Sequence, residues 1–260
     1  MKPRIMLAVV LWLLAPLAHA QWQLLPGLAS DIGVGARGEA WVTGIDQVDG
    51  GHSIYRWTGS DWQIVQGGAL RLDVDPQGNP WVINSAGRIL RLDAGGWQAL
   101  PGLARDIGIG ANGAVWVIGV TQAPGGFTIH RWNGRDWDLV PGGAVRIDAD
   151  PQGNPWVVND QGDVLRLAGG KWQRLSGRGT AVTVGSDGTA WLLGSDRVAG
   201  GYSVQRWTGQ GWRRVPGGAV ALAAGRVPWL VNSDGHIYQW QGRYRDFDER
   251  PQRKRPIARQ

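Results

Sequence analysis

Short stretches in which apolar and polar residues alternate recur along the chain after its first twenty residues. They include residues 32–34, 41–43 and 54–57, and glycine-rich turns such as residues 36–38 separate them. Alternation with a period of two is typical of β-strands, and glycine favours the turns between them. No segment has the apolar spacing and capping residues of a helix. The pattern therefore predicts an all-β protein built from short antiparallel strands.

Tryptophan marks a repeat that organises these strands. A leading tryptophan stands at positions 22, 62, 97, 137, 172 and 212, so the spacing alternates between 40 and 35 residues. A second tryptophan follows in each unit, at positions 41, 81, 116, 156, 191 and 229. The units form three long-short pairs with a period of 75 residues, and the segment Asp-Pro-Gln-Gly-Asn-Pro-Trp occurs at both 75–81 and 150–156. Periods of 35 to 40 residues are typical of solenoids, propellers and arrays.

The strand content of each unit favours a propeller. About four short strands every 35 to 40 residues predict a six-bladed β-propeller of four-stranded antiparallel blades in three long-short pairs over residues 21–242. The alternative, a parallel β-helix, has shorter rungs. The sixth unit lacks an outer strand after Trp240, whereas residues 22–25 have no blade of their own. We therefore expect the N-terminal strand to close the ring, which removes an exposed strand edge.

The two ends of the chain differ from the repeats. Lys2 and Arg4 precede an apolar run over residues 5–17 and the small-residue segment 18–20, which is the order of a secretory signal peptide over residues 1–20. A membrane anchor is the alternative, but the run is shorter than the ~20 residues that a bilayer requires. We expect a secreted or periplasmic protein without a transmembrane segment after signal removal. Residues 243–260 are rich in arginine and are expected to form a basic disordered tail.

The charge distribution argues against a nucleic-acid partner. The formal net charge is +6, but residues 21–240 contain 18 basic and 18 acidic side chains, so the surplus lies at the termini. A basic face on the folded part is therefore not expected. The chain has no cysteine, so its stability must come from packing rather than from disulfides. We expect a monomer.

The repeat unit resembles that of a known family. The unit is quoted from residues 22–42 and 54–59, where it reads Trp-x-x-x-Pro-Gly-x-Ala-x-Asp-Ile and ends Ile-Tyr-Arg-Trp-x-Gly, with the Trp-Val-Ile-Asn element at residues 81–84. It is similar to the tectonin repeat of the tectonin and fish-egg lectin family, over about residues 22–241. The resemblance implies a six-bladed propeller lectin that binds bacterial or methylated glycans, or lipopolysaccharide, in pockets between blades. Animal members often have disulfides, which this chain lacks, so their ligand preference does not carry over.

The residues offer little for catalysis. Three histidines (His52, His130 and His236) and one glutamate (Glu39) lie between the predicted signal peptide and the tail. No constellation of His, Glu or Asp stands apart from the repeat, so we expect neither an enzyme nor a cofactor. Hydrolysis by a pair of the 19 aspartates is the alternative.

Calcium binding is a second candidate chemistry. Six oxygen-bearing residues recur in two repeats: Asp73, Asp75, Asn79, Asp148, Asp150 and Asn154. We favour a solvated β-turn in each, because Asp, Pro, Gly and Asn occupy their preferred turn positions and the bidentate glutamate of an EF-hand loop is missing. No metal site is expected.

The ninth residue after each leading tryptophan lies on the predicted innermost strand. These residues are Asp31, Arg71, Asp106, Arg146, Ala181 and Ala221, so the charge alternates through four units and then disappears. Neighbouring ion pairs along the channel are the structural interpretation. A ligand site in the channel is the functional one.

The candidate ligand site lies at the loops that make three units longer. Each insertion ends in Gly-Gly-aromatic, which makes His52, Phe127 and Tyr202 equivalent, and Asn84, Asn159 and Asn232 end second strands on the same face. A flat ring beside an amide suits a sugar, whose C–H face packs on the ring while its hydroxyls form hydrogen bonds. The alternative is that the aromatic rings only fill the loops between blades. The tryptophans are expected to be core residues.

Two functions are compatible with such a propeller. We favour a lectin that recognises cell-surface glycans or lipopolysaccharide through up to three related pockets. These are expected around His52 with Asn84, Phe127 with Asn159, and Tyr202 with Asn232. The alternative is a protein-interaction or sensor-type propeller without sugar binding.

Overall fold

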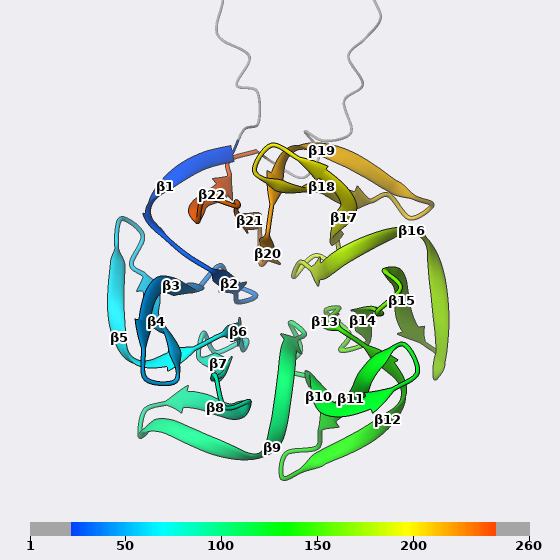
Figure 1. The fold of residues 1–260 in the computed structure, drawn as a ribbon, viewed down its shortest axis with the longest axis horizontal. Helices are drawn as coiled ribbons and strands as arrows, with labels where there is room; N and C mark the ends of the chain where they lie inside the picture. The colour runs from blue at the N-terminus through cyan, green and yellow to red at the C-terminus, as the bar shows by residue number, and fades with distance from the viewer. Residues whose placement is uncertain (1–21, 243–260) are drawn as a thin grey trace, which may run out of the picture.

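The computed structural model describes residues 22–242, and all of the regular secondary structure in this range consists of β-strands. Figure 1 shows the strands arranged in a ring around a central axis. The all-β and β-propeller predictions are therefore confirmed. No helix within this range is long and apolar enough to cross a membrane. The predicted signal peptide (1–20) and basic tail (243–260) lie outside the described residues.

Two of the sheets have four strands. One has the order β2-β3-β4-β5 and contains β2 (Asp31–Val34), β3 (Ala40–Val48), β4 (Gly51–Trp57) and β5 (Trp62–Ala69). The other has the order β1-β22-β21-β20 and contains β1 (Trp22–Leu28), β20 (Ala221–Ala224), β21 (Pro228–Val231) and β22 (His236–Trp240). The second sheet therefore joins the two ends of the described chain.

The other two sheets have seven strands each. The first contains β6 (Arg71–Val74), β7 (Pro80–Ile83), β8 (Arg88–Asp93), β9 (Gly96–Ile109), β10 (Val115–Ala123), β11 (Gly126–Trp132) and β12 (Trp137–Ala144). The second contains β13 (Arg146–Ala149), β14 (Pro155–Val158), β15 (Asp163–Ala168), β16 (Lys171–Val184), β17 (Ala190–Val198), β18 (Gly201–Trp207) and β19 (Trp212–Ala219). The sequence predicted six four-stranded blades, without saying whether neighbouring blades would share a strand. Residues 22–242 form four sheets, because β9 and β16 each run on without interruption and pair with a different strand along each half.

The ring closes where its ends meet. β1 pairs antiparallel with β22, with Trp22 opposite Trp240 and Leu24 opposite Tyr238. The innermost strands also contact one another around the axis, and β2 touches both β20 and β6. In Figure 1 the blue β1 accordingly lies along the outside of the orange β22.

The two tryptophans of each unit have different roles. The second ones lie on β3, β7, β10, β14, β17 and β21 and are at most 4% exposed, as expected for core residues. The leading ones are half-buried, and each indole N–H donates to a backbone carbonyl of the preceding outer strand. Trp22 makes the same bond across the closure, to the carbonyl of Pro216 (2.7 Å). A leading tryptophan is therefore a link between neighbouring units as well as a packing residue.

The insertions of the long units extend strands instead of forming open loops. β3 continues to Val48 and pairs with β4 up to its first residue, Gly51. β10 with β11, and β17 with β18, have the same arrangement. The turn of each hairpin folds onto the next outer strand, where Gly68, Gly143 and Gly218 leave room for it. A Cβ on Gly143 would overlap the carbonyl oxygen of Pro124.

We expect Gly143→Ala to lower the free energy of unfolding by about 1–3 kcal/mol, because the backbone must shift to relieve this overlap. Gly211→Ala is the matched control: a Cβ there meets nothing within 4 Å, and the Gly211 φ is not positive. Urea titrations of both variants test the difference. Equal midpoints would show that the hairpin does not depend on this close approach.

Candidate functional site

The long hairpins bring the predicted site residues together in pairs. His52, Phe127 and Tyr202 are the second residues of β4, β11 and β18, and Asn84, Asn159 and Asn232 directly follow β7, β14 and β21. The backbone N–H after each asparagine donates to the hairpin turn of the preceding long unit: Ser85 to Gly50 (2.8 Å), Asp160 to Gly125 (3.0 Å) and Ser233 to Gly200 (2.9 Å). Each hairpin therefore sits against the asparagine turn of the following unit.

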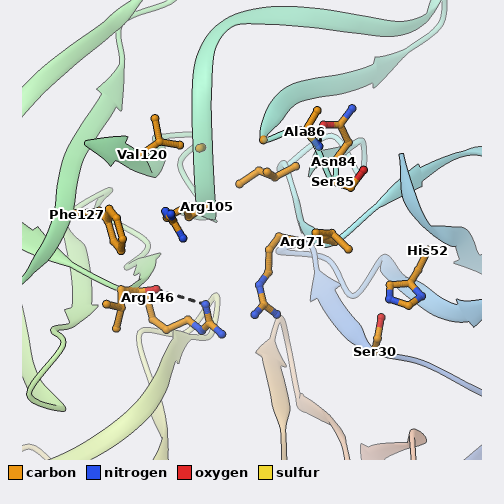
Figure 2. Close-up of a pocket in the computed structure, with 15 residues that line it drawn as sticks. Ser30, His52, Arg71, Asn84, Ser85, Ala86, Arg105, Val120, Phe127 and Arg146 are labelled. Atoms are coloured by element: carbon orange, nitrogen blue, oxygen red, sulfur yellow. Dashed lines mark hydrogen bonds between the residues drawn. The ribbon is translucent and has the colours of Figure 1, made fainter. Parts of the chain in front are cut away.

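One pocket gathers three of the predicted residues. It has a volume of about 780 Å³ and is lined by His52, Asn84 and Phe127 together with Ser30, Arg71, Arg105 and Arg146. Figure 2 shows these side chains converging from several sheets. The sequence assigned His52 and Phe127 to separate pockets, whereas they line the same one. Among the described residues, Asn159, Tyr202 and Asn232 lie outside it.

The side chain of each of the three asparagines accepts hydrogen bonds from the turn that follows it. The Asn84 Oδ1 accepts the backbone N–H groups of Ala86 (3.0 Å) and Arg88 (2.9 Å). Asn159 and Asn232 accept the equivalent pairs of bonds. A side chain that caps its turn in this way is a structural element of the site. The amide oxygens are committed to the turn, so any bond to a ligand from these residues would come from the NH₂ group.

The aromatic side chains are partly covered by arginine. The guanidinium of Arg105 lies 4.0 Å from the centroid of the Phe127 ring, and that of Arg197 lies 4.4 Å from the Tyr202 ring. Arg197 also donates to the Tyr202 hydroxyl (3.0 Å). Cation–π contact explains both arrangements. One face of each ring that was predicted to receive a sugar is thus occupied by a cation.

Arg105 is a pocket residue that the sequence did not lead us to expect. It stands eight residues after the leading Trp97, where the other units have Ser30, Leu70, Val145, Thr180 and Val220. Arg105 is the only charged residue at this position of the repeat, and that difference could have identified it from the sequence. Its position next to Phe127 depends on how β9 and β11 flank β10 in one sheet, which the repeat pattern alone does not specify.

The charges predicted for the innermost strands do face the axis. Asp31, Arg71, Asp106, Arg146, Ala181 and Ala221 all line a small central cavity of about 60 Å³. Arg71 lies 3.4 Å from Asp31 and 3.9 Å from Asp106, and Arg146 lies 4.0 Å from Asp106. The alternating charges therefore form a row of neighbouring pairs, in agreement with the structural interpretation. Burial raises the pKa of Asp31 and of Asp106, although the arginines oppose this.

Aspartates of the inner strands also connect neighbouring units. The Asp106 Oδ2 accepts the N–H of Ile147 (2.8 Å), and the Asp73 Oδ2 accepts that of Ile109 (2.6 Å). Asp148 accepts the Thr183 hydroxyl (2.6 Å) and the N–H of Val184 (2.7 Å). Burial raises the pKa of Asp148 to about 7, while burial and the nearby Asp148 carboxylate raise the pKa of Asp73 well above its usual value.

The candidate calcium residues point in different directions. The Asp75 carboxylate accepts the N–H groups of Gln77 and Asn79 and the side-chain amide of Asn79, all within its own turn. The Asp73 carboxylate instead reaches the next inner strand. These bonds favour the turn interpretation. Within residues 22–242, no three His, Asp or Glu side chains lie close enough together to hold a metal ion.

Comparison with known proteins identifies the repeat. Residues 69–164 match the family described as the tectonin domain. Tectonin-2 of Physarum polycephalum is 35% identical over 74 residues, which are 28% of this chain and 20% of that protein. The chain thus spans about a fifth of the length of this curated relative.

Solved structures agree on the fold. The WD40 β-propeller domain of Doa1 has a TM-score of 0.56 at 11% identity, with 86% of this chain and 98% of that one covered. The structure of YCF48 bound to D1 peptide has a TM-score of 0.55 at 13% identity, with 85% of this chain and 96% of that one covered. At these identities the likeness concerns the fold alone. These structures show that the chain has a β-propeller fold, and the match of residues 69–164 to the tectonin domain agrees with the resemblance that its sequence indicated.

Proposed function

We propose that this protein is a secreted or periplasmic lectin that binds cell-surface glycans or lipopolysaccharide. The ring is proposed to have six blades in three long-short pairs, with β9 and β16 each shared between two blades and β1 completing the last one. The pairing of β1 with β22 and the alternating 40- and 35-residue spacing support this count.

The single observation that carries the proposal is the pocket of about 780 Å³ beside the axis. Its size falls within the range of small-molecule sites, about 300–1,000 Å³. Apolar Leu70, Val120 and Phe127 line it together with the polar Ser30 and Asn84. This mixture suits a sugar, which presents both a C–H face and hydroxyl groups.

Further hollows support multivalent binding. One of about 340 Å³ lies between the first long hairpin and the next sheet, and another of about 390 Å³ lies beside Tyr55 and Trp62. Weak sites on one rigid ring can raise the apparent affinity for a repetitive surface by about 10² to 10⁴. The protein should therefore bind polysaccharide or cell envelopes much better than a monosaccharide.

Retention on immobilised lipopolysaccharide and on a glycan array, with competition by free oligosaccharide, tests this function. His52→Ala and Phe127→Ala should each weaken binding by up to about tenfold, since an aromatic contact contributes about 0.5–1.5 kcal/mol. Tyr202→Ala is the matched control, because Tyr202 lies outside this pocket. Absence of retention, with co-purification of one protein partner, would favour the alternative of a protein-binding propeller.

A further inference from the structure

We propose that the pocket binds an acidic glycan and that Arg105 receives the anionic group, a carboxylate or a phosphate. This inference rests on the proposed lectin function and adds the chemical class of the ligand. Three arginines line the pocket, namely Arg71, Arg105 and Arg146, and Figure 2 shows Arg105 and Arg146 beside Phe127, with Arg71 between them and His52.

The nearby carboxylates leave positive charge at the pocket. Asp31 and Asp106 are the acidic groups that face these arginines, and each also accepts a backbone N–H from the neighbouring inner strand. Arg146 lies 4.0 Å from Asp106, beyond hydrogen-bond distance, and donates to the Val145 carbonyl. Among the described residues, three arginines and no carboxylate line the pocket itself, so its wall is positively charged.

Arg105 is the arginine best placed to meet a ligand. It is exposed, and its guanidinium is held over Phe127 at 4.0 Å. Among the described residues, no carboxylate lies within ion-pair distance of it. A guanidinium packed on a ring still directs its N–H groups outward along its edge, and that planar edge matches the two oxygens of a carboxylate or phosphate.

Polar groups near Arg105 could bind the rest of a sugar. Ser30, His52, Asn84 and Ser85 line the same pocket. The His52 Nδ1 is buried and has no hydrogen-bond partner among the described residues. A ring with one acidic substituent and several hydroxyls fits this set, with the acid at Arg105 and the hydroxyls toward His52 and Asn84.

The charges of the inner strands are confined to one side of the ring. Thr180 and Val220 occupy the positions equivalent to Arg105 on the far side, and Ala181 and Ala221 replace the inner-strand charges there. We therefore expect a single anion site per molecule, even where other hollows bind neutral sugar.

Calorimetry with three probes tests this inference: trigalacturonate, its fully methyl-esterified form, and glucose 6-phosphate. Trigalacturonate should bind the full-length protein at least about tenfold more tightly than its uncharged ester, with one strong site. The difference should shrink as salt is added, because ionic attraction is screened. Tight glucose 6-phosphate binding with weak trigalacturonate binding would instead assign the site to phosphate.

Substitutions locate the site. Arg105→Gln should remove the preference for the charged probe, and Arg105→Lys should restore only part of it, because lysine lacks the planar edge. Arg135→Gln is the matched control: Arg135 is an exposed arginine in the turn at the opposite end of β11. Equal binding of acid and ester, or an unchanged preference in Arg105→Gln, would overturn the anion site but leave the lectin function standing. Failure of all three probes, together with no retention on any glycan, would overturn both.

Discussion

Deletion of residues 22–28 should unfold the whole ring instead of removing one edge strand. β1 lies on the outside of β22, and the Trp22 ring packs against Trp240 with 5.1 Å between centroids. Its indole N–H bonds to Pro216 on β19, so β1 joins the last two sheets of the chain. Without it, β22 becomes an exposed edge, and the contact between the two ends of the chain is weakened. A loss of the cooperative thermal transition, or a melting temperature lower by about 10 °C, is the expected result.

Point substitutions on β1 separate closure from simple loss of chain. Trp22→Ala should cost about 3–5 kcal/mol, because it removes a large packed side chain as well as a hydrogen bond. Leu24→Ala is the matched control, since Leu24 is 56% exposed on the same strand. Guanidinium titrations of the two variants measure the difference. If Trp22→Ala unfolds at the same midpoint as the wild type, β1 does not close the ring.

Acid should stabilise the ring over the range in which its buried aspartates hold protons. Asp148 has a folded pKa of about 7 against 3.8 for an ordinary aspartate, and the pKa of Asp73 is also raised. Between these values the folded protein binds more protons than the unfolded chain does. The free energy of unfolding should therefore fall as the pH rises from about 4 to about 7, by on the order of a few kcal/mol. Thermal melts at pH 5 and pH 8 should show the higher melting temperature at pH 5.

Asp148→Asn tests which groups cause this slope. The substitution removes one titrating carboxyl and the charge that repels Asp73, so it should flatten the pH dependence even if absolute stability falls. Asp160→Asn, which removes an exposed carboxylate in a turn, should leave the slope unchanged. Partial burial lowers the pKa of His130. This histidine therefore makes the free energy of unfolding rise weakly with pH, equally in the wild type and in both variants. An Asp148→Asn slope equal to that of the wild type would contradict the assignment.

Local patterns in the sequence were enough to predict much of this molecule. Alternation with a period of two predicted strands, and the tryptophan spacing predicted a propeller, because each unit must bury the same face against its neighbours. The ninth residues after the leading tryptophans, beginning with Asp31, were correctly placed at the axis, because equivalent positions of each unit occupy equivalent places in the ring. The Asn84 turn and its neighbouring hairpin were also placed on one face, since strand direction alternates within a unit.

Tertiary packing decided what a repeat cannot specify. β9 is one continuous strand that pairs with β8 along one half and with β10 along the other. The repeat does not specify whether the chain passes from the rim to the axis without a break. The shared pocket of His52 and Phe127 arises because side chains from successive sheets converge near the axis, although the sequence separates them by 75 positions. The sequence alone determined the fold class, the repeat and the faces of its strands, all of which follow from local periodicity. The packing of β9, β10 and β11 in one sheet places Arg105 over Phe127, and only the folded structure sets that contact.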